Sequence, residues 1–494
     1  MLGGTRLRGG TGITRELATW QRTLRRSLAD AALSTTLQTL TTGVFIAGFG
    51  LAIGASQLQI GILAALPTLG NIAQIVGSYL IERTGQRKSL CLVSTLVARL
   101  LWFAILGLPF ITLGARVLLV WCVVAALALS SMFAAVGGVA WLSWMKDLVP
   151  NACKADFLSR RNQIGTGLAL SLSVVAGLFL DWCELRGVGS LTGFAWVFGF
   201  AAACGVAAVA FLRSTPDAPM PARDPYVPFM SLLSLPVRDL NFRRLVMFYV
   251  FWNFGVNLAS PFFNVYMLRE LDCPFWFVTL VTTLAGVASL VTNRFWVRLS
   301  SEFGHKPVVF LATLGNAFFP LCWVFIDRPW YWLLVPVHLL GMFNSVLALG
   351  PNNIMFKLAP DRNASAYLAV FNAAIGPATA LAPVLGGLLS STLASVHWSI
   401  GATEIAGVKF IFLCSFVLRL SSLVLLRFVT EPDAEAVRHV VRVVRRAKIT
   451  DLFEGVQIPL RGESPANRQP HQIPTPHFSP REAVPASVGG ETRD

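Results

Sequence analysis

The sequence predicts an all-α polytopic membrane protein with twelve transmembrane helices in two groups of six. Of its 494 residues, 55% are hydrophobic and only 13% are charged, whereas a soluble domain carries about 25% charged residues. Apolar stretches long enough to cross a bilayer, about 20 residues each, recur along the chain. Residues 213–241, rich in Pro and charge, divide these stretches into two sets. Disordered and collagen-like proteins are excluded as overall descriptions.

Each apolar stretch is expected to be a helix, because barrel strands would alternate polar and apolar residues in segments of about 10. The expected spans are residues 28–52, 57–81, 89–111, 117–145, 162–181, 191–212, 242–268, 274–297, 306–327, 330–356, 365–391 and 406–428.

Basic residues predict the orientation of these spans. They gather in the N-terminal segment and in alternate connections, such as those that hold Arg83, Lys146 and Lys306. The connections between carry one Arg or none, which by the positive-inside rule places both termini in the cytoplasm. The net charge of +15 is then a consequence of topology, and we expect no nucleic-acid partner. The expected protein is a multi-pass monomer of the plasma or inner cell membrane, in contact with the lipid bilayer.

The chain divides into five expected parts. These are a cytoplasmic amphipathic segment (1–27), an N-terminal six-helix bundle (28–212), a cytoplasmic linker (213–241), a C-terminal six-helix bundle (242–428) and a basic, partly disordered cytoplasmic tail (429–494). Residues 13–24 and 437–446 each place apolar side chains on one helical face among arginines. This pattern is typical of helices on an anionic membrane surface. A partner-binding or solvated helix is the alternative.

The two sets of spans carry an internal repeat. Pro150 and Asn162 follow the fourth span, and Pro360 and Asn372 follow the tenth with the same spacing. Such a duplication is typical of transporters built from structural repeats.

The connection between spans two and three resembles the glycine, acid and arginine loop motif of the major facilitator superfamily. The residues that carry the resemblance are Gly77, Glu82, Arg83, Gly85, Arg87 and Lys88. It extends over about residues 28–428 and implies two bundles that rock around a central site. It also implies that Glu82, Arg83 and Arg87 belong to a cytoplasmic charge network that holds the outward-facing state.

The corresponding loop after span eight keeps Gly304 and Lys306. However, Trp296 and Ser301 stand where the motif would have its first glycine and its acid. The resemblance therefore leaves a symmetric latch in the C-terminal half unsupported.

Polar stripes on the spans predict a substrate cavity, because polar groups that face lipid are costly. The clearest stripe, on span seven, includes Tyr249, Asn253, Asn257 and Ser260 at helical spacing. The other candidates are Gln38 and Thr41 on span one, Trp141 on span four, and His338, Asn344, Ser345 and Asn352 on span ten. Hydrogen bonding between packed helices is the alternative for each residue.

Two charged residues are candidates for a buried cation or coupling site. Asp30, at the cytoplasmic mouth of span one, is the acid nearest to a membrane interior, although a solvated acid at a helix start is an equal interpretation. Arg99 lies within span three. It is expected to meet an anionic substrate or backbone carbonyls, or to snorkel toward the interface. His338 is a further candidate for titration near neutral pH, with a packed histidine as the alternative.

No nucleotide-binding loop, HExxH, CxxC or GxSxG element occurs in a usable context, so we expect neither an enzyme nor a cofactor or metal. The sequence predicts a secondary active or facilitative transporter that moves a small organic solute across the cell membrane by alternating access. A non-transporting lipid-handling or assembly factor on the same fold is the alternative. The substrate, the direction and a coupling proton stay open.

Overall fold

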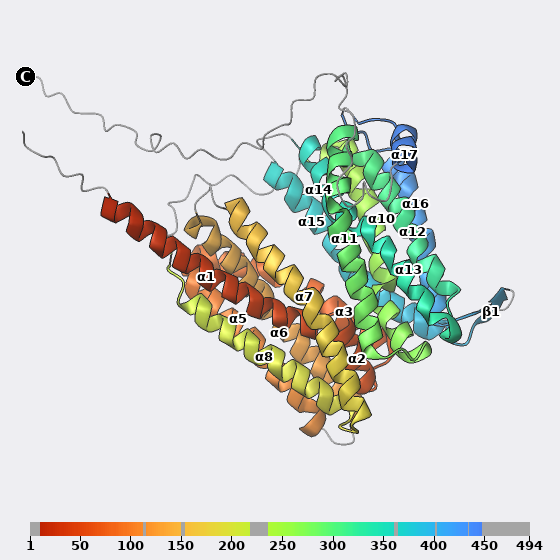
Figure 1. Ribbon diagram of the computed structural model, residues 1–494, viewed down its shortest axis with the longest axis horizontal. Coiled ribbons are helices and arrows are strands. Elements are labelled where there is room, and N and C mark those ends of the chain that lie inside the picture. The colour runs from red at the N-terminus through yellow and green to blue at the C-terminus, as the bar shows by residue number, and fades with distance from the viewer. Residues whose placement is uncertain are drawn as a thin grey trace, which may run out of the picture. The chain divides into compact units, whose positions relative to one another are not determined.

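The computed structural model describes residues 10–111, 115–149, 154–217, 236–359, 364–400, 403–432 and 434–446 (Figure 1), all within one compact unit. For residues 10–23, 155–156, 364–366, 400, 403 and 446 only the backbone is described. Most of the expected linker and the tail after Arg446 lie outside the described residues.

The N-terminal half consists of helices that correspond to the first six predicted spans. They are α1 (Gly10–Thr41), α2 (Val44–Ala52), α3 (Gln57–Gly70), α4 (Ala73–Thr84), α5 (Arg87–Ile111), α6 (Arg116–Leu148), α7 (Lys154–Leu185) and α8 (Ser190–Arg213). Helix α1 is continuous across residue 28, where the sequence predicts the first span to begin.

The C-terminal half repeats this order with more irregular segments. Its elements are α10 (Leu240–Val265), η2 (Tyr266–Glu270), α11 (Phe275–Phe303), α12 (His305–Val324), η3 (Arg328–Leu333), α13 (Leu334–His338), η4 (Leu339–Phe343), α14 (Asn344–Leu358), α15 (Ala364–Thr392), β1 (His397–Ile400), β2 (Thr403–Ala406), α16 (Val408–Arg427) and α17 (Val437–Arg446).

Eleven helical segments of the described chain are long and apolar enough to cross a membrane. The first predicted span corresponds to the end of α1 and to α2, which are separated at Thr42 and Gly43. Gly43 adopts a φ of +60°, a conformation that favours glycine. With this interrupted segment, the predicted polytopic helical fold is confirmed, and the chain is a multi-pass membrane protein.

A small antiparallel hairpin before α16 was not expected from the sequence. Strand β1 pairs with β2 so that His397 lies opposite Ala406 and Ile400 opposite Thr403. Residues 396–406 alternate apolar and polar side chains over stretches shorter than a helix, and this short pattern is masked by the apolar runs on both sides.

The segment after α16 packs on the C-terminal half. Val440 of α17 is fully buried, and α17 contacts α12. The fully buried carboxylate of Glu431 accepts hydrogen bonds from the backbone N–H groups of His305 (3.1 Å) and Lys306 (2.6 Å), at the N-terminus of α12. Lys357, at the end of α14, pairs with the same carboxylate at 2.6 Å. On the apolar side of α17, Val440 therefore meets protein, whereas Val441 is 42% exposed, and contact of this side with the membrane surface stays a prediction.

We call the end of the helices that holds Arg87, Lys146 and Lys357 the basic end, and the other end the opposite end. The two halves meet near the opposite end. Helix α15 packs along α3, and α11 packs along α7, whereas α4 packs chiefly against α6. A Cβ added to Gly61 of α3 would lie 2.2 Å from the Pro383 carbonyl oxygen of α15, so the two backbones touch.

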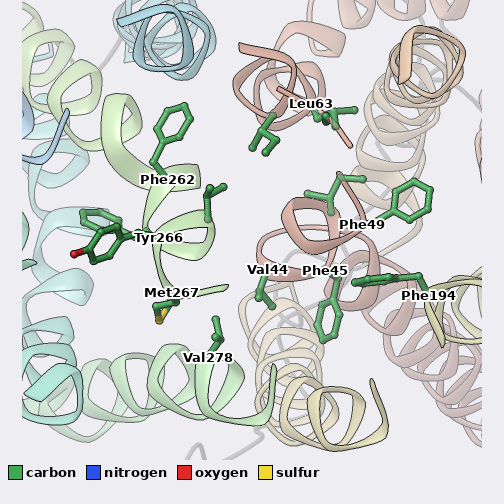
Figure 2. Packing of buried hydrophobic residues seen from close by; sticks show 14 of the residues in the cluster. Val44, Phe45, Phe49, Leu63, Phe194, Phe262, Tyr266, Met267 and Val278 are labelled. Carbon is green, nitrogen blue, oxygen red and sulfur yellow. The ribbon is translucent and has the colours of Figure 1, made fainter. Parts of the chain in front are cut away.

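One apolar cluster joins the halves at this meeting point. In Figure 2, Phe45 of the N-terminal half lies on the side toward Val278 of the C-terminal half, and Phe49, Phe194 and Met267 belong to the same cluster. All five side chains are at most 2% exposed. Because helices in a bilayer associate through van der Waals packing, close packing in this cluster stabilises contact between the halves at the opposite end.

Candidate functional site

A cavity of about 760 Å³ lies among helices of both halves. Its volume falls within the range of about 300–1,000 Å³ that is typical of small-molecule sites. Residues from α1 to α8 form most of its wall, and α10 and α15 complete it.

At the opposite end, Asp181 of α7 joins the two halves. Its carboxylate oxygens accept hydrogen bonds from the backbone N–H groups of Phe275 (2.8 Å) and Trp276 (2.7 Å). These are the first two residues of α11, whose N–H groups have no partner within the helix. A carboxylate at a helix N-terminus is also favoured by the helix dipole. Asp181 is therefore an N-terminal cap supplied by one half to a helix of the other.

Asp30 forms the charged centre of the cavity wall. It is 3% exposed, and its carboxylate pairs with Arg161 of α7 at 3.0 Å. The Ser34 hydroxyl donates to the same carboxylate at 3.2 Å. The Arg161 guanidinium lies over the Trp141 ring, 4.6 Å from its centre. Because α1 begins twenty residues earlier, at Gly10, the interpretation of Asp30 as a solvated acid at a helix start is wrong.

Arg99 lies beside this pair in the same wall. It is 6% exposed and donates to the Gly205 carbonyl oxygen of α8 and, at 2.7 Å, to the Ser34 hydroxyl. Ser34 thus connects Arg99 to Asp30. Snorkelling to the interface does not describe this side chain. The backbone-carbonyl interpretation agrees with the Gly205 contact, and Arg99 also faces the cavity.

Three polar side chains of α10 face the cavity from the C-terminal half: Asn257, Ser260 and Asn264. Asn257 donates to the Asn253 carbonyl oxygen at 2.8 Å. Within the described residues, the Ser260 and Asn264 side chains have no hydrogen-bond partner in the protein. These groups can therefore pair with water or with a ligand.

The remaining wall combines polar and apolar groups. Gln38, Thr41 and Trp141, predicted to face a cavity, all line it. Apolar side chains, among them Leu63 and Trp102, complete the surface.

Two predicted residues of α10 lie outside this cavity lining. The Tyr249 hydroxyl donates to the Leu347 carbonyl oxygen of α14 at 2.6 Å, and its ring stacks on Phe371 of α15. Asn253 donates to the Tyr249 carbonyl oxygen at 2.8 Å. In this structure both side chains form hydrogen bonds within the packed helices, which is the alternative to a place in the cavity.

The predicted residues of span ten also lie outside the cavity lining. His338 is buried, with Nδ1 2.7 Å from the Leu334 carbonyl oxygen. The Asn344 amide oxygen accepts a bond from Asn316 at 3.2 Å, and Asn352 donates to a carbonyl one turn earlier. The Ser345 hydroxyl is buried without a hydrogen-bond partner among the described residues.

The loop between α4 and α5 combines close packing with ion pairing. A Cβ on Gly77 would lie 2.8 Å from Val139 of α6, so this glycine permits close contact between helices. Gly85 ends α4 with a φ of +69°. Arg87 is buried and pairs with Asp147, at the end of α6.

The other charged residues of this loop differ in their surroundings. Lys88 donates to the Thr215 carbonyl oxygen at 2.7 Å, whereas Arg83 and Glu82 are exposed. In the second copy, Gly304 (φ +92°) precedes α12, and Lys306 donates to the Arg427 carbonyl oxygen at 3.3 Å.

No local pattern in the sequence indicates a site role for Arg161, Asn71, Gln74 or Asp181. By its position in the sequence Arg161 belongs to the basic connection after span four, but α7 begins at Lys154 and carries it into the bundle. An indirect sequence signal for Arg161 exists, because an intramembrane acid such as Asp30 requires a cation as its partner. Asn71 and Gln74 line the cavity at the break between α3 and α4, which follows Pro67 by one turn.

Residues 245–462 match the Major Facilitator Superfamily. The comparison with curated proteins gives no match.

Among solved structures, the nucleoside transporter NupG is 12% identical, with a TM-score of 0.61, covering 82% of this chain and 99% of that one. A bacterial homologue of the iron transporter ferroportin in an inward-facing state is 15% identical, with a TM-score of 0.61, covering 83% and 98%. A D-xylose–proton symporter is 16% identical, with a TM-score of 0.54, covering 85% and 99%. The chain therefore has the major facilitator fold, and the superfamily resemblance expected from the loop motif is confirmed.

Proposed function

We propose that this protein is a secondary active or facilitative transporter that moves a small organic solute by alternating access. The observation that carries the proposal is the cavity at the junction of the halves. Both halves contribute polar side chains to it, and the apolar cluster packs the halves together at the opposite end. Membrane transporters of this kind place their sites near the midplane between repeats. The similar nucleoside and D-xylose transporters support the same class.

The positive-inside rule assigns the basic end to the cytoplasm, in the plasma or inner cell membrane. The contacts at the opposite end then make this conformation the inward-facing one. Conversion to the outward-facing state requires that α11 leave the Asp181 carboxylate and that α15 separate from α3. At the same time, the basic ends of the two halves must approach each other. The loop that holds Glu82, Arg83 and Arg87 would stabilise this outward-facing state.

Within the cavity, the α10 amides and hydroxyl are proposed to bind the solute together with Gln38 and Thr41. These side chains belong to different halves. A solute that contacts both sets therefore favours rotation of the two halves toward each other. Asp30 and Arg161 are proposed to keep the polar wall in place, and a coupling proton is one use of this pair.

Solute counterflow in reconstituted vesicles tests the proposal. The panel contains nucleosides, monosaccharides, amino acids and organic acids. We expect saturable counterflow for at least one class, abolished or weakened at least tenfold by Asn257→Leu. Asn253→Leu is the matched control, one turn away on α10 and outside the cavity lining, and it should retain flux. Absence of saturable counterflow for every class would favour a non-transporting lipid-handling or assembly factor.

A further inference from the structure

We propose that the solute is a monovalent organic anion, with a carboxylate that pairs with Arg99 and an apolar body. This inference rests on the proposed transport function and names its substrate class. Three charged residues line the cavity, Asp30, Arg99 and Arg161, and two cations against one anion leave a net charge of +1.

The ion pair within the wall leaves Arg99 without a direct ionic contact, although Asp30 acts on it electrostatically and through Ser34. Asp30 and Arg161 form a direct pair at 3.0 Å, and Arg161 also donates to the Ser27 hydroxyl at 2.6 Å. Arg99 instead donates to two neutral acceptors, the Gly205 carbonyl and the Ser34 hydroxyl. A buried cation without a direct counter-ion is energetically expensive, and an intramembrane charge of this kind marks a functional site.

Arg99 retains donors for a ligand. A guanidinium has five N–H groups in a planar fork, and the two protein contacts of Arg99 use one N–H of Nη1 and one of Nη2. The fork matches the two oxygens of a carboxylate, and such a pair is stronger than a neutral hydrogen bond. A carboxylate at this position would neutralise the cavity as a whole.

The rest of the wall indicates the body of the molecule. Trp102 and Leu63 supply apolar surface in the same cavity, and Ser260 and Asn264 supply unpaired hydrogen-bonding groups from α10. The cavity is thus suited to an anion whose apolar skeleton carries a second, uncharged polar group. A second negative charge has no partner, because the other cation already pairs with Asp30.

Calorimetric titration and thermal-shift measurements on the purified full chain test the inference. The probes are phenylacetate, 3-phenylpropionate and octanoate, each compared with its uncharged primary amide. We expect each acid to bind at least tenfold more tightly than its amide, and Arg99→Gln to remove this preference. The matched control is Arg419→Gln. Arg419 is 3% exposed and donates to Asn316 at 2.9 Å outside the cavity lining, so its replacement should leave the preference unchanged.

A second variant keeps the test decisive if Arg99→Gln fails to fold. Asp30→Asn raises the net charge of the wall from +1 to +2 and frees Arg161, so the preference for acids should increase at least threefold. Equal binding of acids and amides, a preference that persists in Arg99→Gln, a decrease in Asp30→Asn, or no binding of any probe overturns the inference.

Flux separates this inference from the proposed function. Saturable counterflow of a neutral solute that Arg99→Gln leaves intact would overturn the anion assignment and retain the transporter. Acid-selective binding without counterflow of any solute would overturn transport and retain the anion site.

Discussion

The Asp181 cap predicts how strongly one carboxylate holds the two halves together at the opposite end. Asp181→Asn keeps the shape of the side chain but removes its charge and replaces one of its two acceptor oxygens by an N–H₂ group. Hydrogen bonds to a charged group contribute about 1.5–3 kcal/mol each, less where water competes. Because Asp181 is partly exposed, we expect a loss of about 1–2 kcal/mol. This loss is confined to the conformation in which α7 meets α11, and it changes the ratio of conformations by a factor of about 5–30.

Pulsed electron–electron double resonance, which measures distances between two spin labels, gives this ratio of conformations. Spin labels at Arg186 and Glu270, both exposed near the opposite end of different halves, report their separation in a background without the eight native cysteines. Asp181→Asn should increase the population at long distance. The control is Asp239→Asn, because Asp239 caps α10 within one half through the N–H groups of Asn241 and Phe242 (2.9 and 3.0 Å). An equal shift in both variants, or no shift in Asp181→Asn, would contradict a role for Asp181 in holding the halves together.

Three further predictions follow from single contacts. Gly61→Ala places a methyl group against the α15 backbone, and overpacking of about 1–3 kcal/mol should weaken the same conformation, seen as a larger long-distance population by resonance. Glu431→Gln removes the buried charge that pairs with Lys357, so hydrogen exchange in residues 434–446 should accelerate at least tenfold while α5 stays protected. Arg87→Gln leaves Asp147 without this ion pair, and because Asp147 is open to solvent the loss is about 1 kcal/mol, which should lower the midpoint of thermal unfolding; an unchanged midpoint would contradict this.

The sequence predicts the spans because the bilayer sets a simple requirement on length and polarity. It predicts individual cavity residues less well, because the face of a helix that meets the cavity depends on local geometry. On α10, Asn257 and Ser260 face the cavity, whereas Tyr249, two turns earlier, reaches the Leu347 carbonyl of α14. In span ten, the 3₁₀ segments η3 and η4 have about three residues per turn. A stripe drawn with α-helical spacing therefore does not stay on one face, and His338 turns into the packed half.

The charged residues show a second limit. Asp30 and Arg99 were recognised as unusual because each lies in or near a span. Their relation was not visible, because Ser34 connects them only when α1 and α5 pack together. Asp181 and Glu431 act as caps on helices far away in the sequence. Their role follows from tertiary contact with unpaired helix N-termini, and no local pattern encodes the partner.

Thiol labelling from each side of the membrane tests the account most directly. Asn257→Cys places a thiol in the cavity, and Asn253→Cys places one outside its lining on the same helix. In oriented vesicles, a membrane-impermeant thiol reagent should label Asn257→Cys from the cytoplasmic side at least tenfold faster than from the other side. Adding Asp181→Asn should raise labelling from the other side, and Asn253→Cys should react slowly from both. Equal labelling of Asn257→Cys from the two sides without that substitution, or none from either, would contradict a cavity that opens to one side at a time.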